Sequence, residues 1–330
     1  MHMIKHSKAR ANTNIALIKY WGKRDEALLL PMNSSLSMTL DRYYTDTEVT
    51  VDPLLSNDQI LINQNKIDVV SHQNLVKFLN LIREISGKPY FAKVASINYV
   101  PTAAGFASSA SGYAALALAA STAYGLNMTP KELSILARRG SGSASRSIFG
   151  GFVLWHRGQL LNGEDSYSES LVDEVYEWPI EVISAVVSTD KKSISSRTGM
   201  KQTLETSPLY KGWLDSVDGD IMRAIHAIKA KDFTSLGEVV EHNALKMHAT
   251  MMSAWPSIIY FTNGTLEIIN RVQSMRREGI EAYFTIDAGP NVKIICRKSE
   301  TEKVKNTLIQ LSAVQSVQIC GIGKGASLIE

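Results

Sequence analysis

The chain has 330 residues, of which 45% are hydrophobic and 20% are charged, as is ordinary for a globular protein with a sizeable core. Its formal net charge of +3 is too small, and its basic residues are too scattered, to indicate binding to nucleic acid. The two cysteines form no C-x-x-C pair and the histidines lack metal-ligand spacing, so we expect neither a disulfide framework nor a metal site built from protein ligands. No segment has the apolar length of a signal peptide or a membrane span. These features predict a cytoplasmic protein that binds neither nucleic acid nor membranes.

Hydrophobic periodicity in the first half of the chain predicts a mixture of strands and helices. A helix around residues 74–85 ends at Gly87-Lys88-Pro89, and a second helix closes at Gly125. The predicted strands are Ser35–Leu40, Glu48–Val51, Val94–Val100 and Phe152–Trp155, and the predicted helices are Asn74–Ile85 and Tyr113–Tyr124.

The second half predicts an apolar strand, long helices and a final group of strands. Its predicted strands are Val182–Val187, Ala282–Ile286 and Val292–Ile295, its predicted helices are Tyr210–Ala230, Phe233–Met252 and Leu266–Arg277, and a last helix and strand follow. The chain length favours two domains, with a boundary near Trp178–Glu181 that gives domains 1–180 and 181–330. Gly321–Gly325 resembles a nucleotide loop, but because no helix follows it we expect a flexible end.

Residues Pro101 to Gly112, PTAAGFASSASG, stand between a predicted strand and a predicted helix. Small side chains let the backbone approach a polyphosphate, and the free amides at a helix N-terminus favour an anion. The segment is not a Walker A motif, which needs Gly-Lys-Ser/Thr. The residues alone leave two interpretations open, a phosphate-binding loop or a tightly packed turn in which a serine caps the helix.

Four other segments combine charged or hydroxyl side chains with turn residues: Ala11–Lys23, Arg138–Ser147, Ser195–Met200 and Asp287–Val292. Lys19, Tyr20 and Lys23 cluster at one strand end, and such a run is more often a surface edge with a packed aromatic residue. The guanidinium of Arg146, after a Gly/Ser stretch, suits a diphosphate or carboxylate, but a solvated arginine after a turn would look the same. Asp287 precedes Gly-Pro and is held at a rigid turn, where aspartate is also a common turn former.

The Pro101–Gly112 segment resembles the P-x-x-x-G-L-x-S-S-A motif of the GHMP kinase superfamily, with Phe106 where leucine is usual. The other four segments together resemble the diphosphomevalonate decarboxylase family, and the likeness extends from the N-terminus to residue 292. This resemblance implies an α+β, two-domain GHMP kinase-like fold with the active site in a cleft between the domains. It also implies ATP and Mg²⁺ as cofactors, diphosphomevalonate as the substrate, and a homodimer.

The resemblance also implies roles for individual residues. Asp287 is expected on the C3 hydroxyl of the substrate, as base or positioner, Lys19 near the same hydroxyl, Arg146 on the carboxylate and diphosphate, and Asn12 at the reacting end. The expected substrate-binding residues are Ala11, Tyr20, Lys23, Ser141, Gly142, Ser143, Arg146, Ser196, Arg197 and Met200. The expected nucleotide-binding residues are Ser96, Asn98, Pro101, Ala104, Gly105, Ala107, Ser108, Ser109 and Ser111; for Ser96 and Asn98, simple strand polarity is the alternative.

The implied reaction is decarboxylation of diphosphomevalonate after ATP phosphorylates its 3-hydroxyl, because a tertiary hydroxyl is a poor leaving group whereas phosphate leaves readily. Three other functions are compatible with the sequence: a small-molecule kinase that stops at the phosphorylated product, a decarboxylase of mevalonate monophosphate, and a non-catalytic ligand-binding relative. The number of cationic groups expected around the substrate tail favours a diphosphate. The joint presence of Asp287, Lys19 and the small-residue loop argues against a non-catalytic protein.

Overall fold

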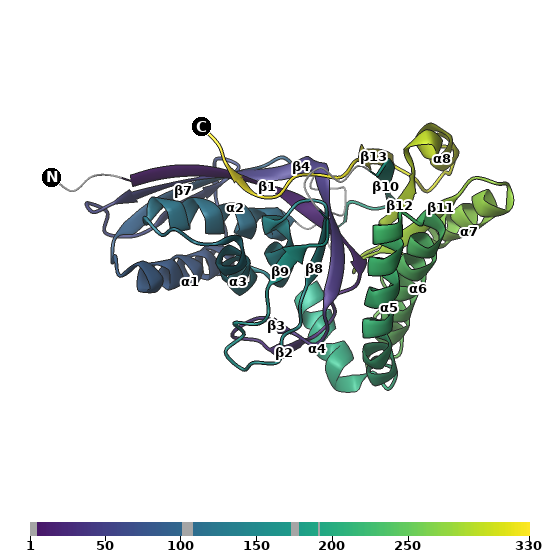
Figure 1. Cartoon of the computed structure of the whole chain (residues 1–330), viewed down its shortest axis with the longest axis horizontal. Coiled ribbons are helices and arrows are strands. Elements are labelled where there is room, and N and C mark those ends of the chain that lie inside the picture. Colours follow the sequence, from purple (N-terminus) through teal and green to yellow (C-terminus); the bar gives the residue numbers. More distant parts are fainter. Residues whose placement is uncertain (1–4, 101–107, 173–177, 191) are drawn as a thin grey trace.

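The structure is a computed structural model that describes residues 5–100, 108–172, 178–190 and 192–330. Its described residues form two large sheets with helices packed against both, together with a small two-stranded sheet (Figure 1). The predicted α+β mixture of helices and sheets is therefore confirmed. No helix in these ranges is both long enough and apolar enough to cross a membrane.

The first sheet is built around two long antiparallel strands, β1 and β4. Its strands are β1 (Lys5–Ile18), β4 (Ser35–Asp52), β5 (Gln59–Ile62), β6 (Asn65–Lys66), β7 (Phe91–Asn98), β8 (Phe152–Trp155), β9 (Ser168–Ser170) and β14 (Ser327–Leu328). The main path is β14-β1-β4-β7-β5-β6, and β8 pairs with the beginning of β4 and with β9. Strands β5 and β7 run parallel, whereas the other pairs are antiparallel.

The second sheet is antiparallel, in the order β11-β12-β10-β13. It consists of β10 (Ile180–Val186), β11 (Ala282–Ile286), β12 (Val292–Arg297) and β13 (Ser316–Cys320), while β2 (Lys23–Asp25) and β3 (Leu30–Pro31) form the small sheet. Successive side chains of a strand point to opposite faces. Tyr283 and Ile295 accordingly join the core under α5 and α6, whereas Phe284 and Ile294 join the core under α7 and α8.

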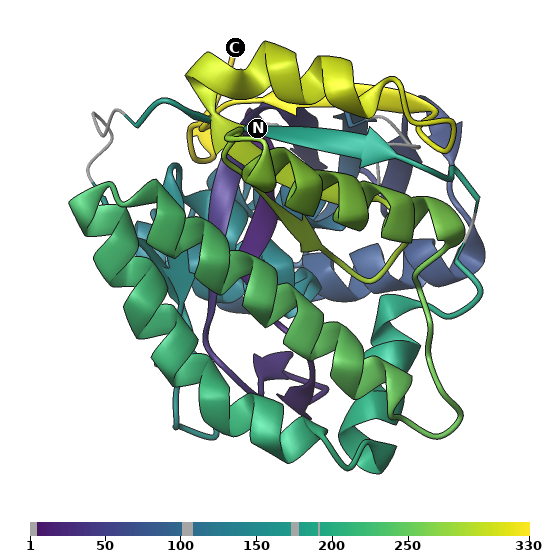
Figure 2. The ribbon, with the colours of Figure 1, turned by 90° about the vertical axis from the view of Figure 1, so that its right-hand side faces the viewer.

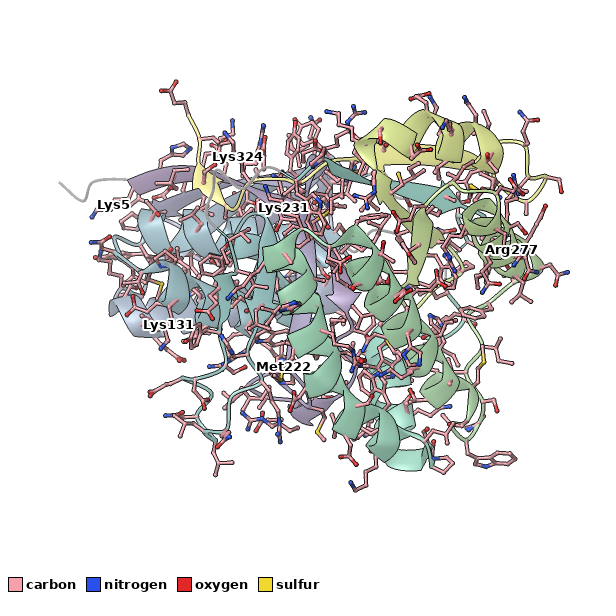
Figure 3. All side chains as sticks on the ribbon, turned by 45° about the vertical axis from the view of Figure 1, so that its right-hand side comes forward. Lys5, Lys131, Met222, Lys231, Arg277 and Lys324 are labelled. Carbon is pink, nitrogen blue, oxygen red and sulfur yellow. The ribbon has the colours of Figure 1, made fainter. Side chains whose placement is uncertain are left out.

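Helices cover one face of the first sheet and both faces of the second, and part of the other face of the first sheet packs into the core that the long helices of the second half share (Figures 1 and 2). The helices are α1 (Val69–Ser86), α2 (Ser108–Ala123), α3 (Pro130–Gly140), α4 (Ser196–Thr206), α5 (Tyr210–Ala230), α6 (Phe233–Met252), α7 (Asn263–Arg277) and α8 (Thr301–Leu308), with short 3₁₀ helices η1 (Gly142–Ile148) and η2 (Lys298–Glu300). Helices α5 and α6 lie antiparallel and side by side (Figure 2). The chain reverses between them at Lys231, labelled in Figure 3, whose φ of 53° is left-handed.

The alanine-rich segment predicted as a helix is α2, which packs directly on β1 and β4. Ala114, Ala117 and Ala120 are fully buried in the same core as Ala9 and Ala11 of β1. Small side chains on both surfaces allow the helix axis to approach the sheet closely. The start of α2 is thereby held beside the end of β1.

The structure extends several predicted elements and adds others. The two strands predicted within residues 35–51 are one continuous strand, β4, because its polar residues Thr39, Thr45 and Thr47 are buried rather than exposed at a turn. Helix α1 begins five residues earlier than predicted, at an Asp68 cap, and ends at Gly87 as expected. Helix α3, capped by Thr129, was not predicted.

The prediction that Gly321–Gly325 is a flexible end is wrong. This segment and β14 form a C-terminal strap, residues 321–328, that crosses the first sheet. Gly323 donates its amide to Thr39 O at 2.7 Å and accepts from the Gly151 amide at 3.0 Å. Strand β14 then pairs with β1, Ala9 opposite Leu328. The strap is ordered because glycine lets its backbone lie where side chains would clash.

We predict that Gly325→Ala destabilises the protein by about 1–3 kcal/mol, because a Cβ there would lie 2.5 Å from the backbone oxygen of Ile148. The matched control is Gly212→Ala, in the exposed surface of α5, where nothing lies within 4 Å of the added carbon. That change should stabilise the helix by about 0.5–1 kcal/mol. Urea unfolding of both variants measures the two effects, and equal stabilities would contradict the assigned packing of the strap.

Candidate functional site

A cavity of about 750 Å³ lies where the two halves of the chain meet. From the first half it is lined by the end of β1, the start of α2 and the Gly140–Arg146 segment. From the second half it is lined by residues around 188–200 and by the turn that follows β11. A ligand in this cavity would contact both halves.

The cavity is strongly cationic. Its described lining carries six basic side chains, Lys19, Lys23, Arg146, Lys192, Arg197 and Lys293, and two carboxylates, Asp190 and Asp287. Partly enclosed charges of one sign attract ligands of the opposite sign. The cavity therefore suits a polyanion.

An ion pair between Lys19 and Asp287 joins the two halves on the cavity wall. Lys19 follows the last residue of β1, and its ammonium donates to Asp287 Oδ1 at 2.7 Å and to Ala16 O at 3.0 Å. The Lys19 side chain is 1% exposed, whereas that of Asp287 is 41% exposed and opens into the cavity. Asp287 comes directly after β11, so its position is set by the edge strand of the second sheet.

The charges around Asp287 control its ionisation. Its enclosed position opposes a negative charge, but Lys19, Lys293 and Lys192 outweigh that effect and hold the pKa of Asp287 below its usual range. Burial lowers the pKa of Lys19, and Asp287 opposes this shift. Burial also lowers the pKa of Lys293, to about 8, against the attraction of Asp287. Asp287 is consequently a stable carboxylate at neutral pH.

Arg146 is buried in η1, with 3% of its surface exposed, and is held by neutral groups. Its guanidinium donates to Ser35 Oγ at 2.8 Å and to Asn14 Oδ1 at 3.2 and 3.3 Å, and it lies over the Trp155 ring. Burial lowers its pKa, to about 10, so it remains charged near neutral pH. None of the ion pairs found in the described ranges includes Arg146. An anionic ligand would supply the missing counter-charge.

Tyr20 and the Gly140–Arg146 segment form a close-packed wall of the cavity. The Tyr20 ring packs edge-on against Trp155, and its buried hydroxyl has no hydrogen-bond partner among the described residues. A Cβ at Gly142 would lie 3.1 Å from that hydroxyl and 2.9 Å from Trp155. Glycine therefore lets the backbone approach, and the Tyr20 hydroxyl is left to donate to a ligand.

Most residues predicted to bind the substrate reach this cavity. Its lining includes Lys19, Tyr20, Lys23, Ser141, Gly142, Ser143, Arg146, Ser196, Arg197, Met200 and Asp287. Ser196, Arg197 and Met200 come from the first turns of α4, whose N-cap is Ser195. The Lys23 ammonium also pairs with Glu26, at 2.7 Å.

The predicted nucleotide-binding residues have three different outcomes. Ser96, Asn98, Ser108 and Ser109 line the cavity, the last two at the N-terminus of α2. Ser111 does not line it; this residue is buried, and its hydroxyl bonds to Thr45 at 2.8 Å. Pro101, Ala104, Gly105 and Ala107 lie outside the described residues.

The structure does not bring Ala11 and Asn12 into the cavity lining. Ala11 is packed in the core beneath α2, and Asn12 donates to Lys324 O of the strap at 3.0 Å. A shift in the register of β1 against β4 between Asn12 and Asn14 is the cause, because an irregularity there changes which residues face α2. Asn14 reaches the cavity instead, donating to Ser143 O and Ser147 Oγ and accepting from Arg146.

Among the charged and amide side chains of the cavity lining that sequence reasoning missed are Asn14, Lys192 and Lys293. Asn14 lies within a segment that was singled out, and only the bulge separates it from Asn12. Lys293 lies on β12 directly after the turn that begins at Asp287, and a lysine in an apolar strand is an available signal. Lys192 donates to Ser196 Oγ at 3.3 Å, and nothing in its local sequence marks it.

The cavity fits a nucleotide better than a metal bound by the protein alone. The start of α2 offers backbone amides and the hydroxyls of Ser108 and Ser109 to phosphate groups. Among the described residues, no group of three or more His, Cys, Asp or Glu side chains could hold a metal ion. Mg²⁺ would thus be held mainly by the phosphate oxygens of a bound nucleotide.

Comparison with known proteins places the chain in a family. Residues 11–168 match the diphosphomevalonate decarboxylase-like N-terminal domain, and residues 182–323 match the mevalonate 5-diphosphate decarboxylase C-terminal domain. The chain belongs to the diphosphomevalonate decarboxylase family. Diphosphomevalonate decarboxylase of Danio rerio is 40% identical over 301 residues, which cover 86% of this chain and 74% of that protein.

Solved structures of this family share the whole fold. Mevalonate diphosphate decarboxylase from Staphylococcus aureus is 43% identical, with a TM-score of 0.95 over 99% of both chains. A complex designated MDDEF with MVAPP, AMPPCP and magnesium is 47% identical, with a TM-score of 0.94 over 99% of this chain and 100% of that one. The GHMP kinase-like architecture expected from the sequence is therefore confirmed.

The buried Lys293 should make stability depend on pH. Its pKa in the folded chain is about 8, below the ordinary 10.5, so the unfolded chain binds more protons between these values and folding gains stability as pH rises. The gain is on the order of 3 kcal/mol across that window. Lys293→Met should remove this dependence on pH. The free energy of unfolding of the variant relative to that of the wild type, measured with urea, should therefore be lower at pH 9.5 than at pH 7. A difference that does not change with pH would contradict the assigned environment.

Proposed function

We propose that this protein catalyses the ATP-dependent decarboxylation of (R)-5-diphosphomevalonate to isopentenyl diphosphate, carbon dioxide, ADP and phosphate. The observation that carries the proposal is the Lys19–Asp287 ion pair on the wall of the cationic cavity, with the start of α2 on the same cavity. Family membership and the complex with MVAPP and AMPPCP described above support the same substrates for this chain.

The substrate's diphosphate and carboxylate would neutralise the excess cations of the cavity. Tyr20, Lys23, the Ser141–Ser143 segment and Arg197 are the groups available to the diphosphate. Arg146, with its planar fork of donors, suits the carboxylate or the nearest phosphate group. Because Arg146 is already fixed by Ser35 and Asn14, little conformational entropy is lost when it binds.

The reacting hydroxyl would lie against Asp287. Transfer of the γ-phosphoryl group to the tertiary hydroxyl forms the new O–P bond and breaks the bond from the γ-phosphorus to the leaving ADP oxygen, and the hydroxyl proton passes to Asp287 as that bond forms. A carboxylate with a depressed pKa is a weak base, so Asp287 mainly aligns the hydroxyl and balances charge. A loose phosphoryl-transfer transition state demands positioning and charge balance more than a strong base.

Lys19 would stabilise the negative charge that moves through the site. Its ammonium is fixed by Asp287 and Ala16 O, and it would lie beside the bond-forming oxygen of a substrate held against Asp287. Mg²⁺, bound with the nucleotide, supplies charge neutralisation of the phosphate oxygens. When phosphate departs, electrons of the C–CO₂⁻ bond form the double bond, and carbon dioxide is released. Arg146 can hold the carboxylate in the orientation that this step needs.

The direct test is an assay of carbon dioxide and ADP release from mevalonate carrying zero, one or two phosphates. We expect turnover with the diphosphate, one carbon dioxide per ADP, and much slower reaction with the monophosphate. ADP formed without carbon dioxide would identify a kinase instead. Tight binding without turnover of any of the three substrates would identify a non-catalytic relative.

Replacing Asp287 by asparagine should lower kcat by about a hundredfold or more, because the amide keeps the shape but loses the charge that aligns the hydroxyl. Binding of AMPPCP, measured by calorimetry, should change little, since the nucleotide contacts proposed above do not include Asp287. Thermal unfolding serves as the control for folding. Near-normal kcat in a folded variant would remove Asp287 from the mechanism.

A further inference from the structure

Lys19 is held by its main chain as well as by its ion pair. Its backbone N–H donates to Asn243 Oδ1 at 2.8 Å, and its carbonyl accepts from Asn33 Nδ2 at 2.7 Å. Lys19 lies just beyond the end of β1, where ladder hydrogen bonds no longer define the backbone. Asn243 of α6 is 0% exposed, and Asn33 of the loop before β4 is 3% exposed. Their side chains make the hydrogen bonds to the Lys19 backbone that a neighbouring strand would otherwise make.

The orientation of the Asn243 amide is set by a buried carboxylate. Asn243 Nδ2 donates to Asp220 Oδ2 at 2.7 Å, and Asp220 is 0% exposed. A carboxylate only accepts hydrogen bonds, so the Asn243 NH₂ group must face Asp220 and its oxygen must face Lys19. Asp220 lies about midway along α5 and Asn243 about midway along α6, so the contact joins the two helices.

Asp220 does not require Asn243 for its own charge balance. Lys246 approaches Asp220 Oδ2 at 2.6 Å, and Arg223 donates to Oδ1. Two cations already neutralise this carboxylate, so the hydrogen bond from Asn243 is not needed to offset the cost of burying its charge. The contact instead fixes which atom Asn243 presents to Lys19.

We propose that Asn243, oriented by Asp220, is a positioning residue that sets the backbone of Lys19 and thereby places the Lys19 ammonium against Asp287. The inference rests on the proposed function, because it concerns the geometry of that reaction. The Lys19 side chain extends from its Cα, so a displacement of the backbone at this residue also displaces the ammonium. Displacements of about 1 Å at a reacting group can cost about a hundredfold in rate.

A second-site suppressor experiment tests the proposal. Asn243→Asp keeps an oxygen for the Lys19 amide but sets two carboxylates within about 3 Å of each other, which is strongly repulsive. We expect kcat to fall about tenfold or more while KM for ATP stays within about twofold. Adding Asp220→Asn should return kcat to within about threefold of wild type, because the amide of residue 220 can then donate to the carboxylate of residue 243, and the Lys246 ammonium, which loses its acceptor on residue 220, can turn to that same carboxylate.

Asp58→Asn is the matched control. Asp58 is also a buried carboxylate in an ion pair, with Arg83 at 2.8 Å, but it does not line the cavity. The Asp58→Asn variant should have a lower unfolding temperature than the wild type. Its kcat, assayed well below that temperature, should be unchanged. The positioning role thus predicts a kcat loss that suppression reverses, whereas a purely structural role predicts only a stability loss.

Each outcome decides the proposal. Normal kcat in folded Asn243→Asp, or a loss that Asp220→Asn does not relieve, overturns it. If Asn243→Asp does not fold, hydrogen exchange on the wild-type chain decides: a Lys19 amide as protected as those of β1 supports the contact, and rapid exchange overturns it. Failure of the proposed function is distinct, because the wild-type protein itself would then release no carbon dioxide.

Discussion

The contact between Lys19 and Asp287 is the constraint around which the site is organised. It joins the end of β1 in the first sheet to the end of β11 in the second, across 268 residues of sequence. A buried ammonium without a partner would cost several kcal/mol, so the fold places the two sheet ends against each other. The cavity, the cations and the helix contacts described above are all arranged about this junction.

Other cations of the cavity are also buried, at a cost in free energy. Arg146 and Lys293 are nine-tenths or more buried, and both have a lowered pKa because their surroundings disfavour charge. Positive groups held together in a partly dry cavity repel one another. The folded protein therefore stores unfavourable electrostatic energy that an anionic ligand relieves, and ligand binding should raise its resistance to unfolding.

Much of the fold could be predicted because its helices and strands carry strong periodic patterns. The long helices α5 and α6 and strands β11 and β12 follow their apolar spacing closely. Strand β4 was divided in two because buried hydroxyl side chains break the pattern of alternation while satisfying one another within the core. The alternation of polar and apolar residues shows only which side chains are polar. It does not show that buried hydroxyl groups form hydrogen bonds within the core.

The residues of the candidate site could be predicted where they stand in a recognisable sequence motif. They could not be predicted where only the path of the folded backbone brings them to the cavity. Asp287, Lys19 and Arg146 stand in recognisable segments, and the structure brings them to one cavity. Asn12 and Asn14 differ only by the bulge between them, and a bulge depends on how β1 meets β4. Lys192 reaches the cavity through the path of the chain before α4, which no local pattern encodes.

The C-terminal strap links the first strand of the chain to the last. During synthesis, β1 leaves the ribosome long before its neighbour β14, so its edge around Ala9 and Arg10 stays unpaired until Ser327 and Leu328 have emerged. An unpaired edge is a template for association with other chains. The strap therefore covers part of the first strand only late in synthesis, and until then that part of the edge is open to association with other chains.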